Sequence, residues 1–131
     1  MIVVDTSVWI DYFRDNETPQ TAWLEIGLER NRLAITDLIL CEILQGIRED
    51  KQYRETLKTL FQLEIYSSGG VDLALAAAEN YRKLQRQGIT IRKTIDCLIA
   101  TFCILNSHSL LHSDRDFDAF EKELDLQVIH P

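Results

Sequence analysis

Four acidic residues stand where a carboxylate could take part in chemistry. Asp5 directly follows the apolar run Ile2-Val3-Val4, and Asp114 follows another apolar run. Glu42 lies inside an apolar helical stretch, and Asp96 precedes nine residues that are almost all apolar. Carboxylates brought together repel one another, and hard divalent cations such as Mg²⁺ or Mn²⁺ prefer such oxygen ligands. Two of these ions, about 3.5–4 Å apart, can promote hydrolysis of a phosphodiester.

Each acid also has an ordinary explanation. Asp5 and Asp114 are of a residue type that commonly caps a helix, and Asp96 would gain from the helix dipole in a first turn. Glu42 could share a solvated helix face with the polar residues three and seven positions further on. Single positions leave both explanations open, whereas the set of four favours a metal site.

The elements that would position these acids alternate between short strands and longer helices. This alternation predicts an α/β fold with right-handed crossovers, a parallel sheet and helices on both faces. Strands are predicted at 2–4, 33–35, 63–66, 109–112 and 126–129, and helices after Asp5 and at about 18–29, 38–47, 50–61, 71–87, 94–105 and 114–123.

Ligands of such folds bind beyond the carboxyl ends of the strands. Asp5 and Asp114 both follow strands, so we expect them at this edge. Asp96 opens the helix that leads into the fourth strand. Chain direction alone would put it at the opposite edge, unless the start of that helix crosses the sheet.

Composition sets the broad class. The 131 residues are expected to form one domain, 1–131, and no apolar run approaches the ~20 residues of a membrane span. With no basic leader, we expect a cytoplasmic protein without membrane contact. Cys41, Cys97 and Cys103 lie in apolar runs and are expected to be buried, reduced thiols. The net charge of −7 indicates either that no nucleic acid is bound or that part of the acid is a metal site.

Four segments together resemble a known family. They are Val3 to Asp11, Glu42 in its apolar helix, Gly88 to Ala100 with Asp96, and Leu111 to Phe117 with Asp114. In order and spacing they look like the four acidic motifs of PIN-domain nucleases. In length and motif wording the chain is most similar to VapC, the toxin of VapBC toxin–antitoxin pairs.

The resemblance implies a three-layer α/β/α fold with a parallel sheet of about five strands in the order 3-2-1-4-5. It also implies that all four acids converge and act in a Mg²⁺- or Mn²⁺-dependent endoribonuclease. Such enzymes cut structured RNA, often tRNA or rRNA, and leave a 5′-phosphate and a 3′-hydroxyl. By this analogy Asp5, Glu42, Asp96 and Asp114 hold the metal and carry catalysis, with Asp116 as a fifth ligand through water.

Thr6 or Ser7 would support the site by hydrogen bonding to Asp5 or to a metal-bound water. The resemblance further implies a homodimer and a VapB-type antitoxin, which lays a helix or tail into a groove and pushes an Arg into the acidic site. Trp9, Tyr12 and Phe13 are candidates for either interface, with core packing as the alternative.

Arg92 and Lys93 form a compact basic pair just before Asp96. They would grip RNA phosphate beside the metal, or belong to an ordinary solvated loop. His108, His112 and His130 are expected in loop or strand roles and not in catalysis. Two other functions remain open: an RNA-processing PIN nuclease outside any toxin–antitoxin pair, and a module that binds RNA or a partner with little catalysis.

Overall fold

A five-stranded parallel sheet organises the molecule. The computed structural model describes residues 1–30 and 32–131. Its strand order is β3-β2-β1-β4-β5, as the resemblance implies, and every neighbouring pair is parallel. The strands are β1 (Ile2–Val4), β2 (Leu33–Thr36), β3 (Glu64–Tyr66), β4 (Ser109–Leu111) and β5 (Gln127–Val128).

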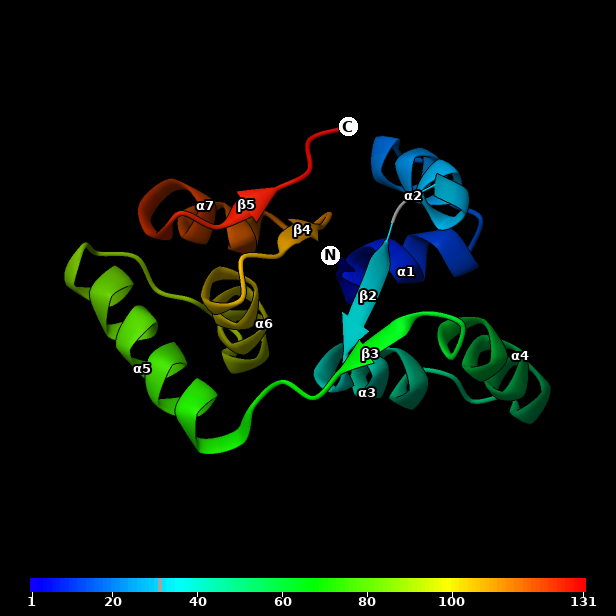
Figure 1. The fold of residues 1–131 in the computed structure, drawn as a ribbon, viewed down its shortest axis with the longest axis horizontal. Helices are drawn as coiled ribbons and strands as arrows, with labels where there is room; N and C mark the ends of the chain where they lie inside the picture. The colour runs from blue at the N-terminus through cyan, green and yellow to red at the C-terminus, as the bar shows by residue number, and fades with distance from the viewer. Residues whose placement is uncertain (31) are drawn as a thin grey trace.

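Helices cover both faces of this sheet, which gives three layers (Figure 1). One face carries α1 (Thr6–Phe13), α2 (Pro19–Arg30), α3 (Asp37–Gln45) and α4 (Asp50–Leu60). The other carries α5 (Gly70–Arg86), α6 (Thr94–Leu105) and α7 (Asp118–Leu124), the last preceded by a 3-10 turn at Arg115–Phe117. The strand order reverses beside β1, and the change of face follows from right-handed crossovers in both directions.

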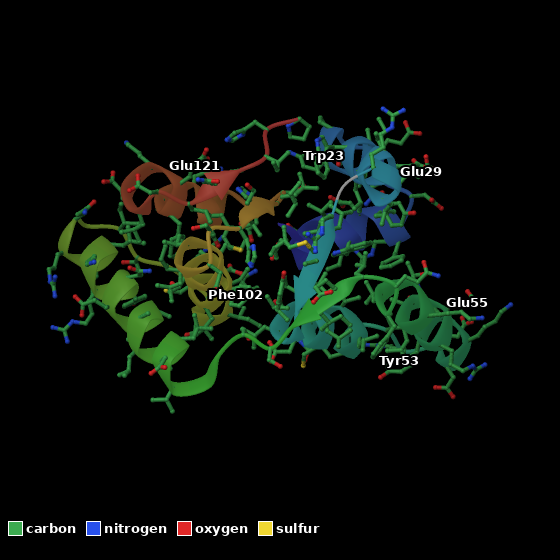
Figure 2. All side chains as sticks on the ribbon, viewed as in Figure 1. Trp23, Glu29, Tyr53, Glu55, Phe102 and Glu121 are labelled. Carbon is green, nitrogen blue, oxygen red and sulfur yellow. The ribbon has the colours of Figure 1, made fainter. Side chains whose placement is uncertain are left out.

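Burial explains why these segments adopt their structures. The central strands β1 and β2 are covered on both faces, and their sequences are therefore continuous runs of mostly β-branched and aliphatic residues. Helix α6 is apolar nearly all round because it lies between the sheet and α5. Figure 2 shows Phe102 of α6 in the interior, whereas Glu29, Glu55 and Glu121 point outward at the periphery.

Most predicted elements are present within two residues of their expected ends. The 114–123 segment differs, because Asp114 caps a 3-10 turn and the α-helix begins only at Asp118. The expectation that all three cysteines are buried is wrong for Cys41: it is exposed, while Cys97 and Cys103 are buried, and all three are free thiols. Helix α3 buries only one face, so its apolar sequence suggests more burial than the helix has. Every helix of the described chain is too short or too polar to span a bilayer.

Candidate active site

Asp5 leaves the end of β1 and caps α1. Its Oδ2 accepts hydrogen bonds from the Ser7 backbone N–H at 3.0 Å and from Ser7 Oγ at 2.6 Å. Its Oδ1 is buried and has no hydrogen-bond partner among the described residues. Burial raises the pKa of Asp5 above its ordinary value, against the lowering effect of the Ser7 hydrogen bonds. The capping explanation therefore holds for one oxygen only, and the other remains available to a ligand.

Glu42 is joined to α1. Thr6 Oγ1 donates to Glu42 Oε1 at 2.8 Å, which ties α3 to the first turn of α1. Of the two hydroxyls expected to support the site, that of Ser7 contacts Asp5 and that of Thr6 contacts Glu42. Partial burial raises the pKa of Glu42, and the nearby charge of Asp5 adds to this effect. Glu42 thus faces Asp5 and does not lie on a fully solvated helix face.

Asp96 lies at the same edge of the sheet. It is only 3% exposed, and its Oδ2 has no hydrogen-bond partner among the described residues. Burial, and next the charge of Asp5, raise its pKa to about 7, while Lys93 opposes the shift. A carboxyl with its pKa raised this far favours a bound proton or a nearby cation.

The position of Asp96 corrects the expectation from chain direction alone. Helix α6 ends at Leu105, just before β4 starts at the amino edge of the sheet. Its 12 residues span about 18 Å, so its other end reaches the carboxyl edge. The segment between α5 and α6 carries the chain back to that edge.

Asp114 and Asp116 lie in the loop after β4 and bring two more carboxylates to the site. The five acids Asp5, Glu42, Asp96, Asp114 and Asp116 are called the acid cluster below. Asp96, Asp114 and Asp116 each offer a carboxylate oxygen, and these oxygens lie within 4.8 Å of one another. Asp114 Oδ1 accepts from the Asp116 backbone N–H at 2.9 Å. The same loop is joined to α1, because the Ser113 N–H donates to Ser7 Oγ at 3.0 Å.

Two basic side chains face these acids. Arg92 donates from Nη2 to both oxygens of Asp116, at 3.1 and 3.0 Å, and from Nε at 3.3 Å. Lys93 Nζ lies 4.0 Å from Asp96 Oδ2 and 3.7 Å from Asp114 Oδ2. The acids, Asp96 foremost, raise the pKa of Lys93. Both basic side chains therefore pair with carboxylates of the cluster.

The donor set suits a hard divalent cation. Asp5 Oδ1 and Asp96 Oδ2 are buried carboxylate oxygens without a hydrogen bond within the described chain, and burial raises the pKa of both groups. Such groups need a compensating charge. Mg²⁺ and Mn²⁺ bind one or more carboxylates and keep several waters, which the half-exposed side of the cluster allows.

Comparison with known proteins identifies the family of the chain. The PIN domain family model matches residues 2–123. The chain belongs to the PIN-domain family. It is 37% identical to "Ribonuclease VapC11" of Mycobacterium tuberculosis, over 98% of this chain and 97% of that protein, and 29% identical to "Ribonuclease VapC1" of Methanocaldococcus jannaschii, over 97% and 85%.

Solved structures show the same fold. VapBC2 from Rickettsia felis, bound to a promoter DNA fragment, aligns with a TM-score of 0.78 at 22% identity, over 98% of both chains. FitAcB from Neisseria gonorrhoeae aligns with a TM-score of 0.76, also at 22% identity, over 100% of this chain and 98% of that chain. At this identity the likeness concerns the fold.

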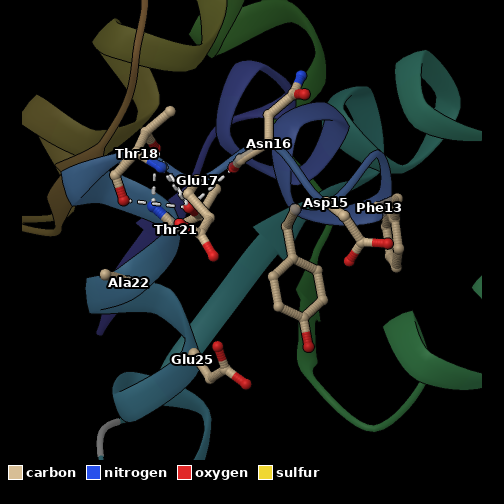
Figure 3. Close-up of a pocket in the computed structure, with 9 residues that line it drawn as sticks. Phe13, Asp15, Asn16, Glu17, Thr18, Thr21, Ala22 and Glu25 are labelled. Atoms are coloured by element: carbon tan, nitrogen blue, oxygen red, sulfur yellow. Dashed lines mark hydrogen bonds between the residues drawn. The ribbon is translucent and has the colours of Figure 1, made fainter.

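This PIN domain also has a hollow of about 530 Å³ where α1 passes into α2, and none of the predicted metal-binding acids lines it (Figure 3). Tyr12 and Phe13 line it, together with Asp15, Glu17 and Glu25. The suggestion that Trp9 forms an interface is wrong. Its side chain is fully buried, donates to the Val4 carbonyl and stacks on Phe13.

The histidines of this PIN domain have no direct contact with the carboxylates of the cluster. His112 Nδ1 accepts from the Asp114 backbone N–H at 3.2 Å, and its ring packs on Phe117. Burial lowers the pKa of His112, which favours the neutral ring. His112 therefore shapes the loop that carries Asp114. This agrees with the loop or strand role expected for His112 from the sequence, although the sequence did not identify its contact with Asp114.

Proposed function

We propose that this chain is a VapC-type endoribonuclease that hydrolyses RNA phosphodiester bonds with Mg²⁺ or Mn²⁺. The observation that carries the proposal is the gathering of acids at one edge of the sheet. Oxygens of Asp96, Asp114 and Asp116 lie within 4.8 Å of one another, and Asp5 and Asp96 each have a buried oxygen without a hydrogen-bond partner in the described chain. The 37% identical relatives named as VapC ribonucleases support the reaction class.

Five carboxylates would hold the metal. Asp5, Glu42, Asp96 and Asp114 are the proposed main ligands, and Asp116 would join through water. A divalent ion held by these residues would supply Lewis-acid chemistry for hydrolysis of the phosphodiester, and the products of the proposed reaction are a 5′-phosphate and a 3′-hydroxyl.

The chain's other residues hold this set in place. Ser7 fixes one oxygen of Asp5 and anchors the loop after β4, while Thr6 fixes Glu42. Both hydroxyls come from the first turn of α1, so one helix start positions ligands from three segments. Preorganised ligands bind a cation without the cost of ordering them first.

Arg92 and Lys93 are the proposed contacts for RNA phosphate. Both stand at the acid cluster, and each is more than half exposed, at 73% and 55%. The Arg92→Ala/Lys93→Ala variant should bind an uncleaved RNA more weakly than wild type. The slope of log affinity against log salt concentration should become less steep by about 1–2. An unchanged slope would contradict this role.

A cleavage assay tests the proposed reaction. Purified protein should cut RNA with Mg²⁺ or Mn²⁺, and excess EDTA should stop it. Asp96→Asn should lose cleavage, whereas Glu55→Gln, which removes an outward-pointing carboxylate of α4, should keep it (Figure 2). Equal product in EDTA contradicts metal dependence, and RNA binding without cleavage favours a binding module.

The RNA would be structured, such as tRNA or rRNA. Mapping the 5′ ends of cellular RNA after induction should show new ends at a small set of sites for wild type and none for Asp96→Asn. Scattered ends over many messenger RNAs would contradict a tRNA or rRNA target.

We propose a basic VapB-type antitoxin as partner and a homodimer as the assembly. The chain's charge of −7 suits a basic inhibitor, and the hollow beside Tyr12 and Phe13 carries the carboxylates of Asp15, Glu17 and Glu25 (Figure 3). A small basic protein encoded next to this chain should co-purify with it and stop cleavage. Its absence from the neighbouring reading frames would favour an RNA-processing nuclease.

A further inference from the structure

Lys93 is the basic residue that reaches deepest into the acid cluster. Its Nζ is close to Oδ2 of both Asp96 and Asp114, at 4.0 and 3.7 Å. The Asp96 oxygen is the buried one that has no hydrogen bond to any described residue. The Lys93 side chain is 55% exposed, so its ammonium reaches the cluster from the solvent side. It can therefore move into water without disturbing the core.

The helix itself does not explain a lysine at this place. Lys93 occupies the N-cap position of α6 and makes no capping hydrogen bond. Lysine has no oxygen to cap the free N–H groups, and its charge opposes the positive end of the helix dipole. The favourable contacts of Lys93 are those with the two aspartates. Its location is thus accounted for by the acid cluster.

We propose that the Lys93 ammonium is a built-in counter-ion that competes with the divalent ion for Asp96 and Asp114. It neutralises part of the cluster before the metal binds and must move away when the ion enters. The displaced ammonium is then free for an RNA phosphate. This inference rests on the proposed metal-dependent function. It assigns to Lys93 control of the affinity for the metal.

The size of the effect follows from charge and distance. A monovalent cation about 4 Å from a divalent one would weaken binding by roughly thirtyfold, even with the screening of water. Movement of Lys93 into solvent reduces this factor but does not remove it. Removal of the charge at position 93 should therefore tighten metal binding, although it removes a proposed contact for RNA.

Direct measurement of Mn²⁺ binding tests the inference without any RNA. Metal-free protein is titrated with Mn²⁺, and free ion is followed by electron paramagnetic resonance. Lys93→Met should bind Mn²⁺ at least about fivefold more tightly than wild type, and Lys93→Arg within about twofold. Lys51→Met is the matched control, because Lys51 of α4 forms no ion pair in the described chain. It should also stay within about twofold.

A second readout uses stability. In EDTA the Lys93→Met variant should melt below wild type, because the aspartates have lost their counter-ion, and Mn²⁺ should raise its melting temperature more. Lys93→Gln serves in both measurements if the Met variant does not fold.

The outcomes separate this inference from the function on which it rests. Equal or weaker Mn²⁺ binding by Lys93→Met, with binding that still depends on Asp96, overturns the role of Lys93 alone. Wild type that binds no Mn²⁺, or Asp96→Asn that binds it undiminished, contradicts the metal site and both proposals with it.

Discussion

Asp96 is the residue at which burial and charge conflict most strongly. Its carboxylate is almost fully buried, one oxygen lacks a hydrogen bond within the described chain, and its pKa is raised to about 7. A group kept under such strain in the metal-free protein destabilises the fold and favours a ligand that relieves it. Burial of the Asp96 carboxylate therefore both lowers the stability of the metal-free fold and favours binding of a cation.

This conflict predicts how stability depends on pH. Asp96 binds its proton more tightly in the folded chain, so its contribution is favourable below pH 4 and is lost as pH rises from about 4 to about 7. In EDTA at pH 8, Asp96→Asn should therefore raise the free energy of unfolding by about 1–3 kcal/mol, and the gain should shrink toward pH 5. Urea unfolding at both pH values measures this.

The matched control is Glu55→Gln, at an outward-pointing carboxylate of α4 (Figure 2). It should change stability little and equally at both pH values. A loss of stability in Asp96→Asn at pH 8 would show that the anion is not strained in the folded protein.

At the scale of elements, the cluster depends on contacts between helix starts. Residues Asp5 and Glu42 come from different crossovers, and the Thr6 hydroxyl joins them through the first turn of α1. Asp96 and Asp114 reach the same edge because α6 runs back along the sheet before β4. A small shift of one helix start would therefore separate the ligands.

Loss of the Thr6 hydroxyl should loosen Glu42. We expect Thr6→Val to lower metal-dependent cleavage about tenfold and to reduce stability by about 1 kcal/mol, because half-buried Glu42 loses its donor. Thr6→Ser keeps the hydroxyl and should retain most activity. The measurements are initial cleavage rates against Mn²⁺ concentration, together with denaturant unfolding. Equal rates for the Val and Ser variants would contradict a positioning role.

Gly88 sets the path from α5 to α6. Its φ of +81° lies in the left-handed region, where a side chain is strained even though a Cβ would meet no atom within 4 Å. Gly88→Ala should therefore destabilise the protein by about 1 kcal/mol. Gly46→Ala is the control, since Gly46 has a φ of −82° and room for a Cβ, and it should cost nothing. Equal effects of the two substitutions would contradict the strain argument.

Periodicity and capping residues predicted the strands and helices well, since nearly every segment buries one continuous face. They did not place the start of α6, because the return of the chain before Thr94 has no sequence signal beyond Gly88. Only the family resemblance put Asp96 with the other acids. The partner of Thr6 and the exposure of Cys41 were missed because both depend on how α1 and α3 pack.

At the scale of the whole molecule, the charge distribution explains an acidic protein that acts on RNA. The net charge is −7, yet two basic side chains stand directly at the carboxylates of the cluster. Divalent ions would neutralise the cluster and let an RNA phosphate approach, and the remaining acidic surface would attract a basic inhibitor. The same surplus of acid thus serves the metal site and the proposed partner.

The position of a bound ion tests the central claim most directly. Crystals grown with Mn²⁺ should give an anomalous peak about 2.0–2.3 Å from carboxylate oxygens of Asp96 and Asp114 or Asp5, and crystals of Asp96→Asn should lose or weaken it. A peak elsewhere on the molecule, or an unchanged peak in Asp96→Asn, would show that these acids do not form the metal site.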